Sequence, residues 1–149
     1  MVLDFARVVD SSMRTFLVEL TLRAVWVHRT TARESAACPV VVVLDECQQL
    51  LWSEKSMPVR ILREGRMFDL AGWFSTHWID KKAEHALGQA ALQAHFRPED
   101  RDISRLARSM GRDGPEEAAR YRQLLYDLQV GQFLWSRPNG QAVVVNVDP

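Results

Sequence analysis

The sequence is poor in several features that would narrow its class. It contains 2 cysteines, Cys38 and Cys47, which flank one predicted strand and form no disulfide framework, so we expect free thiols in a reducing cytoplasm. No apolar stretch approaches the roughly 20 residues that cross a bilayer, so we expect no membrane contact. The formal net charge is +0 at pH 7, so the chain as a whole lacks a strongly basic surface for nucleic acid. Contact with DNA would need local patches or a ring of subunits.

The most informative segment is an apolar run that ends in two acids. Val40–Leu44, bounded by Pro39, is typical of a strand buried on both faces of a parallel sheet. Asp45 and Glu46 follow at the end where open α/β sheets place ligand chemistry. One acid could hold Mg²⁺ and the next could polarise an attacking water, as in a Walker B element. The alternative is a core strand whose last two residues are solvated acids.

Strand and helix patterns alternate over the first two thirds of the chain, and a hairpin pattern ends it. The 149 residues suffice for one domain. We predict a single domain over 1–149 with a three-layer α/β fold: a mostly parallel sheet, helices on both faces and a C-terminal antiparallel hairpin. The hairpin turns at Pro138-Asn139-Gly140. The predicted strands are 2–5, 39–44, 70–75, 89–96, 133–136 and 142–147; the predicted helices are 13–28, 58–68, 79–87, 98–110 and 115–129.

Two further groups of residues follow the acids. Arg60, Arg63 and Arg66 recur at helical spacing and are predicted to share a face. The segment 75–77 (Ser-Thr-His) ends the next strand. Phosphoryl-transfer ATPases need acids for metal and water, a polar residue at the γ-phosphate, and an arginine that can act on a neighbouring subunit's nucleotide. The alternatives are a solvated helix face and ordinary residues at a strand end.

In this order the segments VVVVLDECQQLL, LREGRMFDLAGWFSTHW and LYDLQVGQFLW resemble the C-terminal half of the HerA/FtsK-type P-loop ATPases. That family includes HerA-like helicases and translocases and the conjugative coupling ATPases. The resemblance covers about residues 2–147. It implies Asp45 as the Mg²⁺ ligand, Glu46 as the catalytic acid and Arg66 as an arginine finger acting in trans. It places His77 where family members carry a sensor glutamine, with Thr76 beside it at the nucleotide.

The chain departs from the family pattern in one large respect. No glycine is followed by lysine, so no G-x-x-x-x-G-K-[ST] loop is present to cradle phosphates. We therefore expect the Walker B half of an ATPase that couples ATP hydrolysis to DNA translocation or unwinding, with weak or no ATP binding by itself. The expected partners are a segment or subunit carrying the loop, and further copies in an oligomer or ring. Smaller departures are His77 for glutamine and Asp69 for glycine.

Two other functions fit parts of the sequence. The first is a non-catalytic interaction or scaffold domain that keeps the P-loop NTPase fold. The second is a DNA-binding module built on the predicted helix pair 102–111 and 116–127, against which the neutral net charge argues. Hydrolysis that depends on Glu46 would separate the first of these from the ATPase interpretation.

Overall fold

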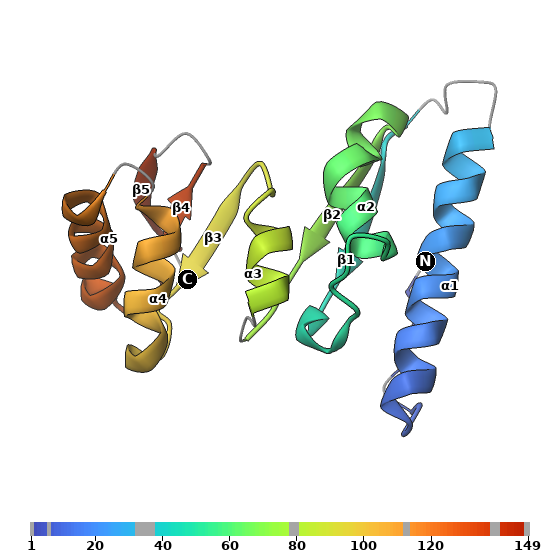
Figure 1. Cartoon of the computed structure of the whole chain (residues 1–149), viewed down its shortest axis with the longest axis horizontal. Helices are drawn as coiled ribbons and strands as arrows, with labels where there is room; N and C mark the ends of the chain where they lie inside the picture. Colours follow the sequence, from blue (N-terminus) through green and yellow to red (C-terminus); the bar gives the residue numbers. More distant parts are fainter. Residues whose placement is uncertain are drawn as a thin grey trace. The chain divides into compact units, whose positions relative to one another are not determined.

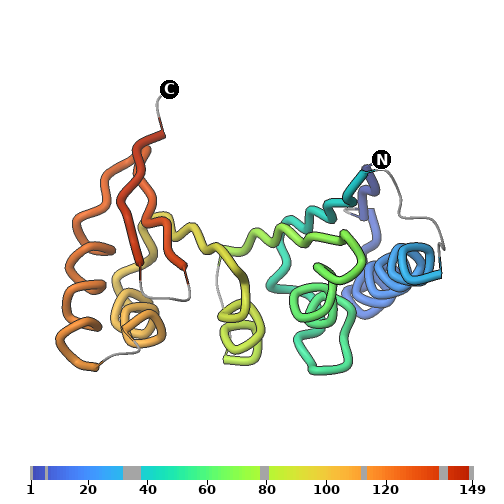
Figure 2. Tube along the Cα trace, turned by 90° about the horizontal axis from the view of Figure 1, so that it is seen from above, coloured from blue at the N-terminus to red at the C-terminus, as the bar shows by residue number. Residues whose placement is uncertain are grey.

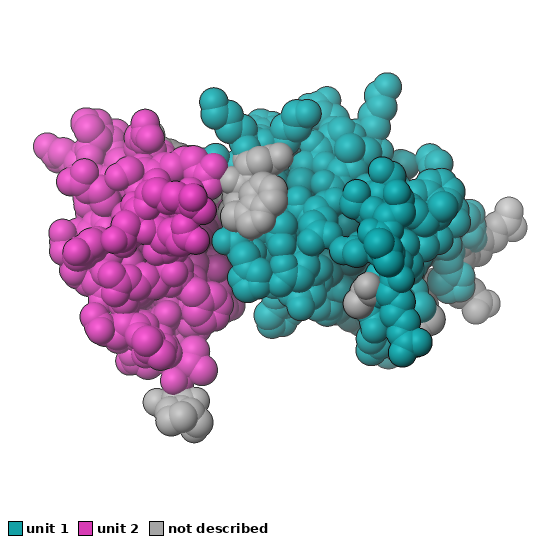
Figure 3. Space-filling model, turned by 90° about the horizontal axis from the view of Figure 1, so that it is seen from below, with its two compact units in different colours: residues 1–89 teal, residues 90–149 magenta. Residues whose placement is uncertain are grey.

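The computed structural model describes residues 2–5, 7–31, 38–77, 81–111, 114–137 and 141–147. Contacts within the chain divide it into two compact units, Met1–Gln89 and Ala90–Pro149, which Figure 3 shows in two colours. Each unit has its own cluster of buried apolar residues. The expectation of one domain over the whole chain stays a prediction.

The first unit is built on two parallel strands. β1 (Val40–Leu44) and β2 (Leu70–Phe74) pair from Val40 opposite Leu70 to Leu44 opposite Phe74 (Figure 1). The carboxyl ends of both strands therefore lie at the same edge of the pair. The other elements of this unit are the α-helices α1 (Ser11–Thr31), α2 (Met57–Glu64) and α3 (Lys81–Leu87) and the short 3₁₀ helices η1 (Cys47–Gln49) and η2 (Gly65–Phe68).

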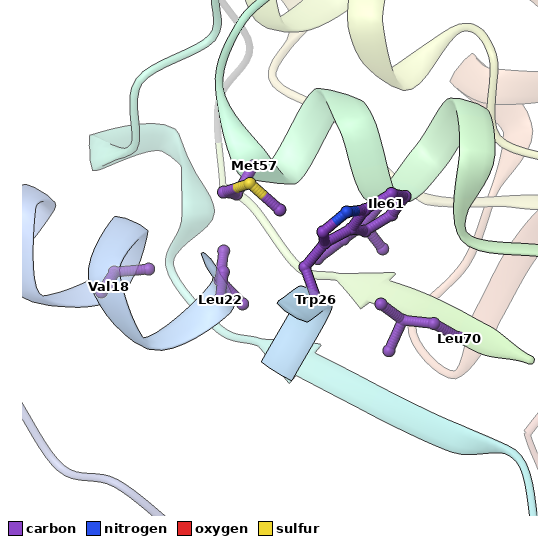
Figure 4. Packing of buried hydrophobic residues seen from close by; sticks show 6 residues of the cluster. All are labelled: Val18, Leu22, Trp26, Met57, Ile61 and Leu70. Atoms are coloured by element: carbon purple, nitrogen blue, oxygen red, sulfur yellow. The ribbon is translucent and has the colours of Figure 1, made fainter. Parts of the chain in front are cut away.

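The core of the first unit joins α1, α2 and β2. α1 begins at a cap, because Asp10 Oδ1 accepts a 2.6 Å hydrogen bond from the Met13 backbone N–H. Trp26 of α1 meets the Phe68 ring edge-on, with 5.1 Å between ring centroids. The buried cluster around it, drawn in Figure 4, contains Val18, Leu22, Trp26, Met57, Ile61 and Leu70.

One face of the β1–β2 pair is exposed. Figure 2 shows α1, α2 and α3 on one side of the two strands. On the other face Val41, Val43 and Trp73 are 57%, 65% and 68% exposed. The prediction that Val40–Leu44 is buried on both faces is therefore wrong here, because side chains alternate along a strand and the described helices cover one face. A third layer stays a prediction.

The second unit is antiparallel. Strand β3 (Gln93–Phe96) pairs with β4 (Gln132–Ser136), and β4 pairs with β5 (Ala142–Asn146). Between β3 and β4 the chain forms the helices α4 (Asp100–Met110) and α5 (Pro115–Asp127). The core of this unit contains Ile103, Ala107, Tyr121, Leu125, Leu128 and Leu134.

The mixed α/β class and the C-terminal hairpin are confirmed, but the sheet is less parallel than predicted. The described strands form one parallel pair and one three-stranded antiparallel sheet. The predicted strand at 89–96 enters the antiparallel sheet because α4 and α5 return the chain so that β4 runs opposite to β3. Residues 2–5 contain no strand. The predicted turn at 138–140 lies outside the described residues, and no described helix is long and apolar enough to span a membrane.

Candidate site at the carboxyl ends of β1 and β2

The polar residues predicted from the two strand ends lie side by side. Asp45 and Glu46 follow β1, and Ser75, Thr76 and His77 follow β2. Two backbone hydrogen bonds hold the ends together beyond the ladder. Ser75 N–H donates to the Leu44 carbonyl at 2.9 Å, and Cys47 N–H donates to the Ser75 carbonyl at 2.9 Å. The sequence therefore places both acids beside the Ser-Thr-His segment.

Asp45 is held as a carboxylate by two donors. The Ser75 hydroxyl donates to Asp45 Oδ1 at 2.6 Å, and the Glu46 backbone N–H donates to the same oxygen at 3.0 Å. Hydrogen bonds to the charged form favour it. The Ser75 hydroxyl, and after it the Glu46 N–H, lowers the pKa of Asp45 below its ordinary value. Asp45 is therefore ionised at neutral pH.

Ser75→Ala is expected to raise the pKa of Asp45 toward its ordinary value, because it removes the hydrogen bond that lowers this pKa most. A carboxyl whose pKa is lowered in the folded state stabilises the fold at neutral pH. That contribution is lost as the pH falls through the lowered pKa. An NMR titration of the Asp45 side-chain carboxyl carbon measures the change, with Ser109→Ala as the control. An unchanged pKa in Ser75→Ala would contradict the assignment.

Glu46 lies in a hydrogen-bonded ring that joins the two strand ends. His77 Nε2 is 2.7 Å from Glu46 Oε1, an ion pair when the imidazole is protonated. The Gln48 side-chain amide donates to Glu46 Oε2. The Thr76 hydroxyl closes the ring by donating to Gln48 Oε1 at 3.0 Å. Both oxygens of Glu46 are thus held, one from each strand end.

The backbone at Glu46 is unusual. Its φ of 55° and ψ of 39° place it in the left-handed region, which few residues other than glycine adopt. This conformation begins η1 and turns the chain, so that Cys47 goes inward while Glu46 stays at the surface. The left-handed turn therefore presents the Glu46 carboxylate to His77.

Cys47 is a packing residue rather than a reactive thiol. Its side chain is buried with Trp52, Val59, Ala83 and Ala86, and Trp52 Nε1 donates to its carbonyl at 3.1 Å. Burial is the main cause that raises the pKa of the Cys47 thiol to about 11. The protonated thiol is a poor nucleophile at neutral pH.

We expect iodoacetamide to modify Cys38 in the folded protein and Cys47 only after unfolding. Cys38 is exposed, whereas Cys47 is buried and protonated. Peptide mapping after a short reaction at pH 8, with and without denaturant, distinguishes the two thiols. Equal labelling of both in the folded protein would show that η1 opens readily.

The three predicted arginines do not form a common face at this site. Arg60 Nε forms an ion pair with Glu64 Oε2 at 3.0 Å. The guanidinium carbon of Arg60 lies 4.5 Å from the Trp26 ring centroid. Arg63 donates to Gln89 at 2.9 Å. Arg66 is exposed on η2, which leads into the start of β2. It therefore precedes the amino end of β2, whereas the acids follow the carboxyl end of β1, and the strands between these ends are about 16 Å long at roughly 3.3 Å per residue.

Two residues that the sequence did not single out make structural contacts. One lies in the site, and the other connects α1 to the segment before β2. Gln48 links Glu46 to Thr76, but an amide two residues beyond an acid has no distinctive spacing. Arg29 is buried in α1, and its Nε donates to the Phe68 carbonyl at 3.0 Å. A charged residue near a helix end gives no sequence signal of burial.

The acids offer a partial rather than a complete metal site. Among the described residues no group of three or more histidine, cysteine or acidic side chains is arranged to hold a metal ion. Mg²⁺ requires less, because it is usually bound by one or two carboxylates together with waters and substrate phosphates. Both described hydrogen bonds to Asp45 go to Oδ1, which leaves Oδ2 to serve as a ligand. Asp45 Oδ2 therefore fits Mg²⁺ in that role, while both oxygens of Glu46 already meet His77 and Gln48.

Comparisons with known proteins identify the fold. No family model matches the sequence, and no curated protein matches it. Among solved structures, the chain is similar to the genome packaging NTPase of Sulfolobus turreted icosahedral virus 2, determined in complex with AMPPCP. The match has a TM-score of 0.66 and 15% sequence identity, and it covers 91% of this chain and 62% of that chain. An identity this low carries the fold alone. We conclude that this chain shares the mixed α/β fold of that structural neighbour and spans less than two thirds of its length.

Proposed function

We propose that this chain is the Walker B part of a P-loop ATPase of HerA/FtsK type. The observation that carries the proposal is the hydrogen-bonded network of Asp45 and Glu46 with residues 75–77 at one edge of a parallel strand pair. Ligands of open α/β sheets bind outside the carboxyl ends of the strands. The similarity to an NTPase solved with an ATP analogue supports the same interpretation.

Asp45 would hold the metal and Glu46 would act on water. The lowered pKa of Asp45 keeps Oδ2 charged at neutral pH, which suits a Mg²⁺ ligand. When bound, Mg²⁺ would supply positive charge that stabilises the charge on the phosphate oxygens. Glu46 would orient a water molecule toward the γ-phosphorus and take its proton as the bond to the β–γ bridging oxygen breaks. Thr76 and His77 would contact the γ-phosphate.

Arg66 would act on the nucleotide of a neighbouring subunit. It is exposed and lies at the end of the strands away from Asp45, so it does not reach the acids of its own chain. An arginine supplied in trans stabilises the charge of the transition state. This role requires the oligomer or ring that the family resemblance implies.

The work coupled to hydrolysis would be movement along DNA. The structural neighbour is a genome packaging NTPase, and the HerA/FtsK resemblance implies DNA translocation or unwinding. The formal net charge of +0 indicates that DNA contact depends on local patches assembled from several subunits rather than on one basic chain.

Reconstitution tests the proposal. The neighbouring genes are searched for a polypeptide that carries a G-x-x-x-x-G-K-[ST] loop, and a neighbourhood that encodes none counts against the proposal. The polypeptide found is mixed with the full chain, and ATP hydrolysis is measured with Mg²⁺ present. We call this mixture the reconstituted assembly. Hydrolysis by the mixture, and by neither polypeptide alone, is the expected result. No nucleotide binding and no hydrolysis in the mixture would reject the proposed function.

A non-catalytic interaction domain is the second candidate, and the exposed face of β1 and β2 is a surface that such a domain would use. Val41, Val43 and Trp73 present an apolar surface of a kind that soluble proteins usually cover. The same face would seat a partner segment in the ATPase interpretation, so it does not by itself separate the two functions.

Trp73→Arg is expected to weaken association through this face by at least about tenfold, since it buries a charge where an aromatic side chain packs. Analytical ultracentrifugation of the chain alone, and of the reconstituted assembly, measures the dissociation constant. Trp135→Arg, on β4 in the second unit, is the matched control. If the wild-type chain is a clean monomer in both experiments, this face binds nothing.

A further inference from the structure

We propose that Gln48 is a positioning residue for Glu46, and that it couples the Thr76 hydroxyl to the Glu46 carboxylate. The inference rests on the proposed function for the role of Glu46. Gln48 is not one of the acids or phosphate contacts assigned above. It touches one residue from each strand end and would act through them.

The backbone fixes where the Gln48 side chain starts. Glu46, two residues before it, is in the left-handed conformation, and Cys47 beside it is buried in a cluster that includes Trp52. The η1 turn is closed by a 3.1 Å hydrogen bond from Leu50 N–H to the Cys47 carbonyl. Gln48 therefore projects from a turn that is anchored on both sides.

The two ends of the Gln48 amide have different chemistry, and each meets a matching partner. Its NH₂ group donates to Glu46 Oε2, and its carbonyl oxygen accepts from the Thr76 hydroxyl at 3.0 Å. A carboxylate can only accept hydrogen bonds, so the NH₂ group must face Glu46. The carbonyl end is then left for Thr76. Reversing the amide would break both contacts.

This arrangement makes the placement of Glu46 depend on Thr76. A hydroxyl carries one hydrogen, and in this structure Thr76 gives it to Gln48. A phosphate oxygen that takes that hydrogen removes the donor from the Gln48 carbonyl. The amide is then free to turn, and Glu46 Oε2 is held less firmly. Gln48 thus transmits a change at the phosphate contact to the residue that orients water.

An NMR experiment on the full chain without nucleotide tests the coupling. The side-chain carboxyl carbon of Glu46 is observed in the wild type and in the Thr76→Val, Gln48→Met and doubly substituted proteins. We expect Thr76→Val to shift this resonance when Gln48 is present and to leave it unchanged in the Gln48→Met background. Thr76→Ser keeps the hydroxyl and should leave it unchanged, as should Thr21→Val in α1. The backbone amide spectrum confirms that each variant is folded.

Two results would overturn the inference: an equal shift from Thr76→Val in both backgrounds, or no shift in either. In the reconstituted assembly, Gln48→Met should lower kcat by about tenfold or more with KM changed less than about twofold, because a misplaced catalytic group costs rate rather than binding. Unchanged kcat in Gln48→Met, with hydrolysis intact in the wild type, rejects the role of Gln48 alone. Absence of hydrolysis in the wild type rejects the proposed function and leaves the NMR result standing.

Discussion

Glu46→Gln is expected to lower ATP hydrolysis by the reconstituted assembly at least about 100-fold, because a general base contributes roughly 10²–10⁴ to the rate. The amide keeps the size of the side chain and can still meet His77 and Gln48, but it cannot accept a proton from water. Binding of the nucleotide should be nearly unchanged, since Asp45 and its hydrogen bonds remain. Steady-state hydrolysis and binding of a fluorescent ATP analogue measure the two effects.

Glu54→Gln is the matched control for this prediction. Glu54 is 81% exposed and lies 3.6 Å from Arg63, outside the network at the strand ends. Its substitution should leave hydrolysis within about twofold of the wild type, as expected for a surface ion pair of little consequence. If Glu46→Gln hydrolyses ATP as fast as Glu54→Gln, Glu46 does not orient the water and the acids serve another purpose.

Trp26→Ala should destabilise the first unit by about 3–5 kcal/mol, the range for removing a buried aromatic side chain. Trp26 is 5% exposed, packs edge-on to Phe68 and lies beneath the Arg60 guanidinium. Because whole proteins are stable by only about 5–15 kcal/mol, this loss would remove much of the stability of the fold. Urea denaturation followed by circular dichroism measures the change in the free energy of unfolding.

Trp73→Ala provides the control with the same chemistry at an exposed position. Trp73 is 68% exposed, so its truncation at low protein concentration should change the free energy of unfolding by no more than about 0.5 kcal/mol. Similar losses for the two substitutions would mean that the outer face of β2 is covered in solution, in conflict with the exposure described above.

The residue pattern predicted most of the elements but not their surroundings. Apolar spacing, together with proline and acidic residues at helix starts, located the five α-helices of the described residues, and the run at Val40–Leu44 located β1, but the strand predicted at 2–5 is absent. The same run predicted burial on both faces, because an uninterrupted apolar sequence does not show whether one face of the strand or both are covered. The alternation of strands and helices predicts a mostly parallel sheet, yet β3 pairs antiparallel with β4, since local pattern does not reveal which partner a strand takes.

The candidate site was predictable where it depends on topology. Parallel strands bring their carboxyl ends together, and that alone placed Asp45 and Glu46 beside residues 75–77. The position of Gln48 depends on the left-handed turn at Glu46. A glutamate in a sequence does not predict such a turn, so this part of the site could not be foreseen. Helical spacing suggested one arginine face, but α2 gives way to η2 before Arg66.

The left-handed backbone at Glu46 ties the position of an acid to a cost in folding. A non-glycine residue in that region costs roughly 1 kcal/mol or more. Glycine would remove that cost, but it would also remove the carboxylate that faces His77. Replacing Glu46 by glycine should therefore relieve backbone strain and, in the same step, take away the acid that the chain presents at its surface.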